Sequence, residues 1–360
     1  MLSFKKNLIL VYLLLGMHFL ATSCSSSNEN EAIFTETATD PTATKNKNPG
    51  HYLAVKEDFE LSELKFLKEP AIKGVIKRYF WKDLETEKGV YDLSKIENDL
   101  AFLNNLNKQL IVFITDKSFF GASVLPEYLK NYEITNEKIT VPKRWESFVI
   151  YRTILLGNSI TEKFDNRLNF EGVALQESAL SLPAAILETN GYTPEKYRDA
   201  LIETINGIEK KAKQSQVFWY MNFLPGNNDY LAEIVNNLTS KNIVLSGPDI
   251  LPYRLGLKDI TYPLYEKFKD QFYLGCSVQW DSYKHHKNDT TFLARDSAPI
   301  HEEGYIELKE IFAFGRDRLF LNYVFWSYFE NPPVEDAFDT EDAVEVIRKN
   351  PEFNPKNNSF

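Results

Sequence analysis

Carboxylate, amide and tryptophan side chains recur in this sequence directly after short apolar runs. Gln176 and Glu177 follow one such run, and Trp280 and Asp281 follow another. Two carboxyl groups placed on either side of a bond can act as acid and base, or as acid and nucleophile, in hydrolysis. Side chains of similar types close the other runs: Arg78, Trp81, Asp116, Asn222, Asp249, Tyr253, Gln279 and Trp326.

Eight apolar runs alternate with amphipathic stretches, which is the pattern of βα units around a parallel sheet. The run 109–115 is continuously apolar, as expected of a strand that is buried on both faces. The other predicted strands are 51–55, 74–79, 172–176, 216–222, 242–246, 272–278 and 319–325. Eight strands over about 280 residues predict a (β/α)8 barrel, an α/β TIM barrel. A doubly wound open sheet is the alternative, but no glycine-rich phosphate loop follows the first strands.

Helices are predicted between the strands over 93–107, 193–213, 229–237 and 305–313. The second of these begins with Thr193 as N-cap and Pro194 at the first helical position. In a barrel the carboxyl ends of all strands meet at one face, so the strand-end residues would form one ring. Aromatic faces beside carboxylates and amides suit a sugar, which offers C–H faces to stack on and hydroxyls to bond.

Residues 78–93 read RYFWKDLETEKGVYDL. This segment resembles the second-strand region of retaining (β/α)8-barrel glycoside hydrolases, the clan of beta-galactosidases, xylanases and cellulase-like enzymes. Those families carry an arginine on this strand and a W-x-x-L-E-P-x-x-G-x-Y-D-F-like run after it. Here Thr86 stands in place of the proline and Leu93 in place of the phenylalanine. The resemblance implies the barrel and the superfamily, without specifying a substrate.

In those families the fourth strand ends in an Asn-Glu pair whose glutamate is the general acid/base. The resemblance therefore makes Glu177 the acid/base and Gln176 a partner of the sugar 2-hydroxyl. It further implies that Arg78, Asn222, Asp249 and Tyr253 position the sugar and the carboxylates, while tryptophans stack on the substrate. The expected stacking residues are Trp81, Trp280 and Trp326.

The seventh strand departs from the family pattern, because Gln279 stands where a glutamate is usual. Asp281 would serve as the nucleophile if the strand runs two residues longer or bulges. Asp116 or Asp249 could supply the second carboxylate instead, and His301, Glu302 and Glu303 are further candidates. The remaining alternative is a barrel that has lost hydrolysis and binds a glycan through residues such as Gln279.

The front of the chain predicts export. Lys5 and Lys6 precede an apolar run over 8–20, which fits a secretory signal peptide. The segment leading to Cys24 resembles a bacterial lipobox, so Cys24 would carry the lipid that anchors the protein to the outer membrane. The expected domains are a signal peptide (1–23), a flexible tether (24–50), the catalytic barrel (51–345) and a C-terminal tail (346–360).

Composition limits the partners. The chain has 41 basic and 51 acidic side chains, a net charge of −10, which disfavours nonspecific nucleic-acid binding. Beyond Cys24 the only cysteine is Cys276, so no disulfide framework exists. No zinc, phosphate-loop or nucleophile-elbow motif is present. We therefore expect a monomer that acts on a carbohydrate, without cofactor or metal.

Overall fold

The computed structural model describes residues 47–238, 242–252, 254–283, 307–332 and 337–350, with the backbone alone described at Leu255, Trp280 and Asp281. All described residues belong to one compact unit within Pro41–Phe360. The expected signal peptide and Cys24 lie outside the described residues, as do Tyr253, His301, Glu302 and Glu303.

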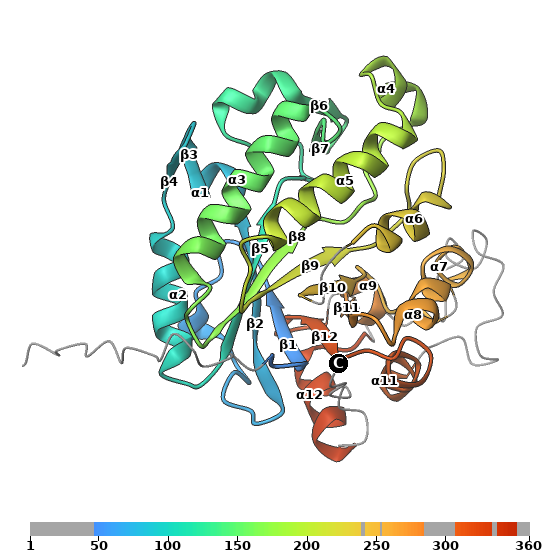
Figure 1. Ribbon diagram of the computed structural model, residues 1–360. Helices are drawn as coiled ribbons and strands as arrows, with labels where there is room; N and C mark the ends of the chain where they lie inside the picture. Colours follow the sequence, from blue (N-terminus) through green and yellow to red (C-terminus); the bar gives the residue numbers. More distant parts are fainter. Residues whose placement is uncertain (1–46, 239–241, 253, 284–306, 333–336, 351–360) are drawn as a thin grey trace, which may run out of the picture. The chain divides into compact units, whose positions relative to one another are not determined.

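Eight parallel strands close into a barrel, which confirms the predicted (β/α)8 fold (Figure 1). Strand β1 pairs in parallel with both β2 and β12, so the first and last strands complete the ring. The strands are β1 (Gly50–Val55), β2 (Ile72–Phe80), β5 (Gln109–Thr115), β8 (Phe170–Leu175), β9 (Gln216–Tyr220), β10 (Ile243–Ser246), β11 (Tyr273–Val278) and β12 (Tyr323–Ser327).

The eighth strand begins later than the sequence predicts. Leu319 ends the turn after helix α11 (Leu308–Asp317), and β12 starts only at Tyr323. The apolar run 319–325 therefore combines a buried turn with the first half of a strand, because burial alone does not mark where a strand starts.

Helices cover the outside of the barrel (Figure 1). The longest, α3 (Ser147–Phe164), was not expected from the sequence, and it packs beside α5 (Pro194–Glu209) through close contacts of Gly157 with Ile208. Helix α12 (Thr340–Lys349) includes part of the segment 346–360 that was assigned to a tail. The other helices are α1 (Trp81–Leu84), α2 (Ser94–Asn104), α4 (Ala184–Thr189), α6 (Tyr230–Asn236), α7 (Leu255–Ile260), α8 (Tyr262–Phe268) and α9 (Trp280–Tyr283).

Short elements complete the connections. Helical turns of the 3-10 type occur at η1 (Leu61–Glu63) and η2 (Glu127–Tyr132). Two hairpins lie outside the barrel, formed by β3 (Glu85–Glu87) with β4 (Val90–Tyr91) and by β6 (Glu133–Asn136) with β7 (Ile139–Pro142).

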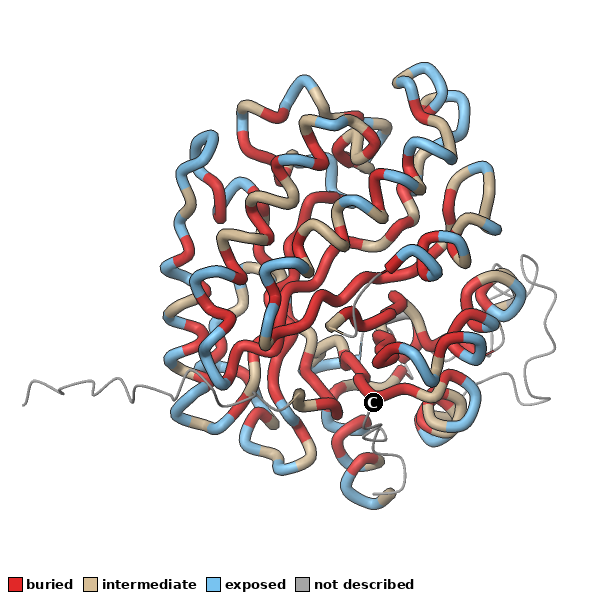
Figure 2. The backbone as a smooth tube through the Cα atoms, viewed as in Figure 1, coloured by how far each residue is buried: buried red, intermediate tan, exposed pale blue. Residues whose placement is uncertain are grey.

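The barrel strands are buried on both faces (Figure 2). Alternate side chains point inward and form an aromatic interior, which includes Phe113, Phe218, Tyr220, Tyr323 and Phe325. The intervening side chains point outward and join the larger core between barrel and helices. This alternation of period two decides which strand-end residues can reach the barrel mouth.

A buried carboxylate closes the N-terminal end of the barrel. Glu171 accepts hydrogen bonds from Tyr323 Oη at 2.7 Å and from Gln216 Nε2 at 3.0 Å. It also accepts one from the backbone N–H of Asn48 at 2.8 Å. These bonds fasten the segment before β1 across the end of the barrel opposite its mouth.

Candidate active site

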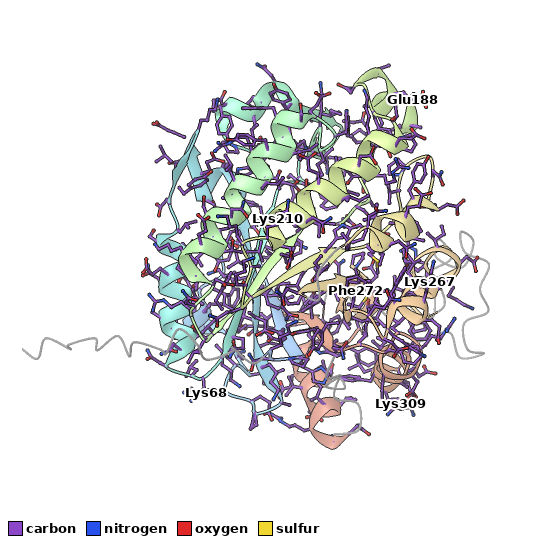
Figure 3. All side chains as sticks on the ribbon, viewed as in Figure 1. Lys68, Glu188, Lys210, Lys267, Phe272 and Lys309 are labelled. Atoms are coloured by element: carbon purple, nitrogen blue, oxygen red, sulfur yellow. The ribbon has the colours of Figure 1, made fainter. Side chains whose placement is uncertain are left out.

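A cavity of about 870 Å³ opens at the carboxyl ends of the strands, where the ring of polar residues was expected. Arg78, Gln176, Glu177 and Gln279 all line it, so four of the predicted site residues come together. Aromatic side chains fill the barrel interior. Lys267 of α8 and Lys309 of α11, by contrast, lie on outer helices (Figure 3). The cavity is therefore the candidate active site.

Glu177 is held in place through both carboxylate oxygens. Lys117 Nζ donates to Oε1 at 3.0 Å, and Asn222 Nδ2 donates to Oε2 at 2.6 Å. The side chain keeps 14 % of its surface exposed, toward the cavity. Strands β5, β8 and β9 are neighbours in the barrel, so they bring Lys117, Glu177 and Asn222 together although these residues are far apart in the sequence.

Lys117 is a site residue that the sequence analysis missed. Its side chain is fully buried, and Nζ also donates to the Ala179 carbonyl and to Ser181 Oγ, both at 2.8 Å. Burial lowers the pKa of this ammonium group, and the neighbouring Glu177 carboxylate counteracts that shift. Continuing the inward alternation of β5 from Phe113 through Thr115 would have pointed to Lys117.

Asp116 does not face the cavity, which corrects the expectation that it binds substrate or supplies the second carboxylate. It accepts two hydrogen bonds from Arg144, at Nε (2.8 Å) and Nη2 (2.6 Å). Burial alone would lower the pKa of Arg144, but the Asp116 carboxylate raises it above its ordinary value. Arg144 Nη1 in turn donates to the Glu177 backbone carbonyl at 2.7 Å, so Asp116 acts as a support behind Glu177.

Arg78 points into the barrel from the end of β2, as its place in the alternation with Ile76 requires. Its guanidinium lies over the Phe113 ring at 4.4 Å from the ring centroid. Burial lowers the pKa of Arg78, partly offset by the charges of Tyr220, Glu57 and Glu177. Within the described part of the chain, the guanidinium forms neither a hydrogen bond nor an ion pair.

The seventh strand presents an amide to the cavity. Gln279 continues the inward alternation of β11 from Ser277, and its Nε2 donates to the Pro248 carbonyl at 2.9 Å and to Asp249 Oδ1 at 3.0 Å. Strand β11 ends at Val278 and α9 follows, so the strand extension on which Asp281 depended does not occur. The side chains of Trp280 and Asp281 lie outside the described residues.

Gln176 and Tyr220 complete the floor of the cavity. Gln176 Oε1 is buried and has no hydrogen-bond partner among the described residues. Tyr220 accepts a hydrogen bond from Ser277 Oγ at 3.2 Å, and burial raises the pKa of its phenol. This buried carbonyl next to Glu177 can accept a hydrogen bond from a ligand hydroxyl or a water.

Trp81 and Trp326 are not stacking residues, which corrects two further expectations. Trp81 is fully buried and its Nε1 donates to Glu85 at 2.8 Å. Trp326 is 1 % exposed, stacks on Phe312 at 4.6 Å between ring centroids and donates to His51 Nδ1 at 3.1 Å. Both belong to the outward-facing set of their segments, so they pack against the helices and not against a substrate.

The motif that follows β2 is structural. Besides the indole of Trp81, the buried Glu85 carboxylate accepts hydrogen bonds from Tyr128 Oη at 2.7 Å and the Gly89 backbone N–H at 2.8 Å. It also forms an ion pair with Arg152 of α3. The Trp-x-x-Leu-Glu part of the sequence pattern therefore fixes helix α3 and the β3–β4 hairpin to the barrel.

Exposed phenylalanines form a rim that the sequence analysis did not single out. Phe119 and Phe120, after β5, expose 42 % and 88 % of their surface and line the cavity. Lys117 Nζ lies over the Phe119 ring at 4.5 Å. Phe59 and Phe329, from the loops after β1 and β12, are also part of the lining. These rings replace the tryptophans as candidate stacking surfaces for a sugar.

The described residues contain no group of three His, Cys, Asp or Glu side chains placed to hold a metal ion. Cys276 is buried, and burial raises the pKa of its thiol, so it is not an activated nucleophile. No helix in the described ranges is both long and apolar enough to span a membrane.

Comparison with known proteins finds similarity only at the level of structure. No protein-family model matches the chain, and no curated protein sequence matches it. Endo-glycoceramidase II from Rhodococcus sp. superimposes with a TM-score of 0.51 at 10 % identity, over 82 % of this chain and 77 % of that chain. A second solved structure, a glycoside hydrolase, gives a TM-score of 0.52 at 11 % identity, over 84 % of this chain and 99 % of that chain. The likeness is one of fold alone: the chain shares the (β/α)8 barrel with these structures.

Proposed function

We propose that this protein is a glycoside hydrolase that acts on an extracellular oligo- or polysaccharide, with Glu177 as general acid/base. The observation that carries the proposal is the placement of Glu177 at the barrel mouth, held by Lys117 and Asn222 beside an aromatic-lined cavity. Glycoside hydrolases solved with the same fold support it, among them the endo-glycoceramidase recorded as a lactosyl-enzyme intermediate.

The proton for the leaving oxygen is held on the Lys117–Glu177 pair in this proposal. Because burial lowers the pKa of Lys117, transfer of its proton to Glu177 becomes easier as a bound sugar expels water from the mouth. Glu177 would then protonate the glycosidic oxygen and afterwards take a proton from the attacking water. Asn222 keeps the carboxyl group oriented through both steps.

The second carboxylate is proposed to be Asp281 or Asp249. Asp249 is held at 3.0 Å by the amide of Gln279, which lines the cavity. Asp281 lies three residues after the end of β11, at the same face of the barrel. A carboxylate that attacks the anomeric carbon gives retention of configuration, whereas one that activates water gives inversion.

A glycan panel tests hydrolysis. We expect wild-type protein to release new reducing ends, and Glu177→Gln to lower that rate by about 100-fold or more while the protein stays folded. Asp281→Asn and Asp249→Asn identify the second carboxylate, and Glu188→Gln, an exposed residue on α4, is the matched control. Cleavage that is unchanged in Glu177→Gln would contradict the proposal.

Binding without cleavage is the second candidate function, and Gln279 is the observation that favours it, since a neutral amide stands in the cavity wall on the seventh strand. A glycan that binds wild-type and Glu177→Gln protein equally, with no new reducing ends from either, would establish this alternative.

We also propose that Cys24 is lipidated and anchors the protein to a bacterial outer membrane, on the evidence of the apolar run and the lipobox-like residues before it. Expression with radiolabelled palmitate tests this idea. Wild-type protein should take up the label and sediment with outer membranes, whereas Cys24→Ala should do neither.

A further inference from the structure

Arg78 lines the cavity, and hydrolysis by Glu177 does not by itself explain its charge. A guanidinium carries five N–H donors in a planar fork. One face of the Arg78 plane is covered by the Phe113 ring at 4.4 Å. Among the residues that the structure describes, no acceptor engages its N–H groups.

The neighbouring acids do not neutralise Arg78 by direct contact. Glu57 and Glu177 both act on it through space, but neither forms an ion pair with it. The two oxygens of Glu177 are occupied by Lys117 and Asn222. A partly buried guanidinium whose donors lack acceptors costs free energy that a suitable ligand would recover.

The lining of the cavity carries unpaired positive charge, although the whole chain is acidic. Glu177 is paired with Lys117, and Glu330 at the rim is paired with Lys65 at 3.2 Å. Arg78 and Lys56, which also line the cavity, have no ion-pair partner in the described part of the chain. Next to β11, the lining offers the neutral amide of Gln279.

We propose that the glycan recognised by this protein carries an anionic substituent, a carboxylate or a sulfate ester, and that Arg78 binds this group inside the cavity. The inference rests on the proposed function, because it names the substrate class of the same site. Carboxylates and sulfates accept two parallel hydrogen bonds from a guanidinium, and such charge-assisted pairs are stronger where water is excluded. The Phe113 ring holds the guanidinium plane in position for this contact.

Paired ligands test the inference on the purified full-length protein. The first pair is a uronic-acid oligosaccharide and its carboxyl-reduced form, and the second is a sulfated oligosaccharide and its desulfated form. Affinities are measured by calorimetry in a Glu177→Gln background, with and without Arg78→Gln, so that the ligand is not cut. Arg318→Gln removes the same charge at an exposed site before β12, at the opposite end of the barrel, and is the control.

We expect removal of the anionic group to weaken binding about 10- to 100-fold when Arg78 is present. Arg78→Gln should abolish that difference, and Arg318→Gln should preserve it. The carboxylate pair or the sulfate pair, whichever shows the coupling, identifies the substituent. A purely structural role of Arg78 would instead weaken the charged and neutral ligands equally.

Three outcomes would overturn the inference: equal binding of charged and neutral ligands, a charge preference that survives Arg78→Gln, or no binding of any acidic glycan at millimolar concentration. Failure of the proposed function is distinguishable. If the coupling is found but the protein with Glu177 intact cuts nothing, hydrolysis is wrong and the anion site stands. If a neutral glycan is cut as fast as an acidic one, hydrolysis stands and the anion site is wrong.

Discussion

The Glu177 carboxylate has a buried ammonium group as its closest charged neighbour. Lys117 Nζ donates to Oε1 at 3.0 Å, and its other two hydrogen bonds go to the Ala179 carbonyl and the Ser181 hydroxyl. All three donors of the lysine are therefore used, and the side chain has no exposed surface. Such a pair fixes the position of the Glu177 carboxyl group and places the protons of an ammonium group beside it.

Lys117→Met should lower the turnover of a cleavable glycan by about 100-fold, within the range of effects on general acid–base catalysis. Since the lost group is the proposed proton source, the acidic and basic limits of the pH–rate profile should also move. Steady-state kinetics across pH measure both effects. Lys163→Met, at a surface ion pair with Glu97, is the control. An unchanged profile in Lys117→Met would remove this lysine from the mechanism.

Arg144→Met should lower the free energy of unfolding by about 3–5 kcal/mol, because it leaves the buried Asp116 carboxylate without its bidentate partner. Urea denaturation measures the change. Arg198→Met breaks an exposed ion pair with Glu233 and should lower the free energy of unfolding far less, because solvent screens that pair. Similar losses of stability in the two variants would show that the buried Asp116–Arg144 pair stabilises the fold no more than a surface ion pair does.

At the scale of elements, strand alternation decides which residues reach the mouth. Arg78 lies at an inward position of β2, and Gln279, just after β11, continues the inward alternation of that strand. Trp326 in β12 and Trp81, the first residue of α1, face outward and pack in the core under the helices. A shift of a single residue moves a side chain from the substrate side to the helix side. To tell which strand-end residues face the mouth, one must know which alternate positions of each strand point inward. The buried interior positions of each strand supply that information.

Helix α5 begins where its N-terminal residues predict, with Thr193 Oγ1 accepting from the Lys196 backbone N–H at 3.2 Å. Thr193→Ala should lower the free energy of unfolding by about 1 kcal/mol, because that N–H loses its partner. Thr193→Ser, which keeps the acceptor, should restore most of it. Chemical denaturation of the three proteins checks the prediction, and a serine variant as unstable as the alanine one would refute the capping role.

At the scale of the whole molecule, buried tyrosines make the fold sensitive to alkali. Burial raises the pKa of six phenols well above the ordinary value, namely those of Tyr52, Tyr79, Tyr262, Tyr265, Tyr283 and Tyr323. Burial raises the pKa of the half-buried Tyr328 to about 12. In the unfolded chain all of these phenols ionise near pH 10, roughly the ordinary pKa of tyrosine.

Stability should therefore be constant with respect to these groups below about pH 10 and decline as the pH rises above it, since only the unfolded chain then releases protons. Thermal unfolding at a series of pH values measures the decline, and the absorbance of phenolate should appear together with unfolding. Ionisation of all tyrosines in a chain that stays folded would contradict this prediction.

The sequence by itself determined the barrel and much of its mouth. Strands that are buried on both faces appear as continuous apolar runs, so 109–115 could be bounded correctly without a structure. The meeting of Arg78, Gln176, Glu177 and Gln279 in one cavity follows from the rule that parallel strands end at one face. The N-cap of α5 was predictable because it depends on neighbouring residues only.

Tertiary structure alone decided the remainder. Helix α3 is rich in β-branched residues of low helix propensity, and packing against α5 stabilises it. The pairing of Lys117 and Asn222 with Glu177 joins the ends of three strands that are distant in sequence. Arg144, which belongs to the loop before α3, binds Asp116 and keeps it away from the cavity. Such contacts depend on register and side-chain direction across the closed barrel, which a local pattern of residue types does not contain.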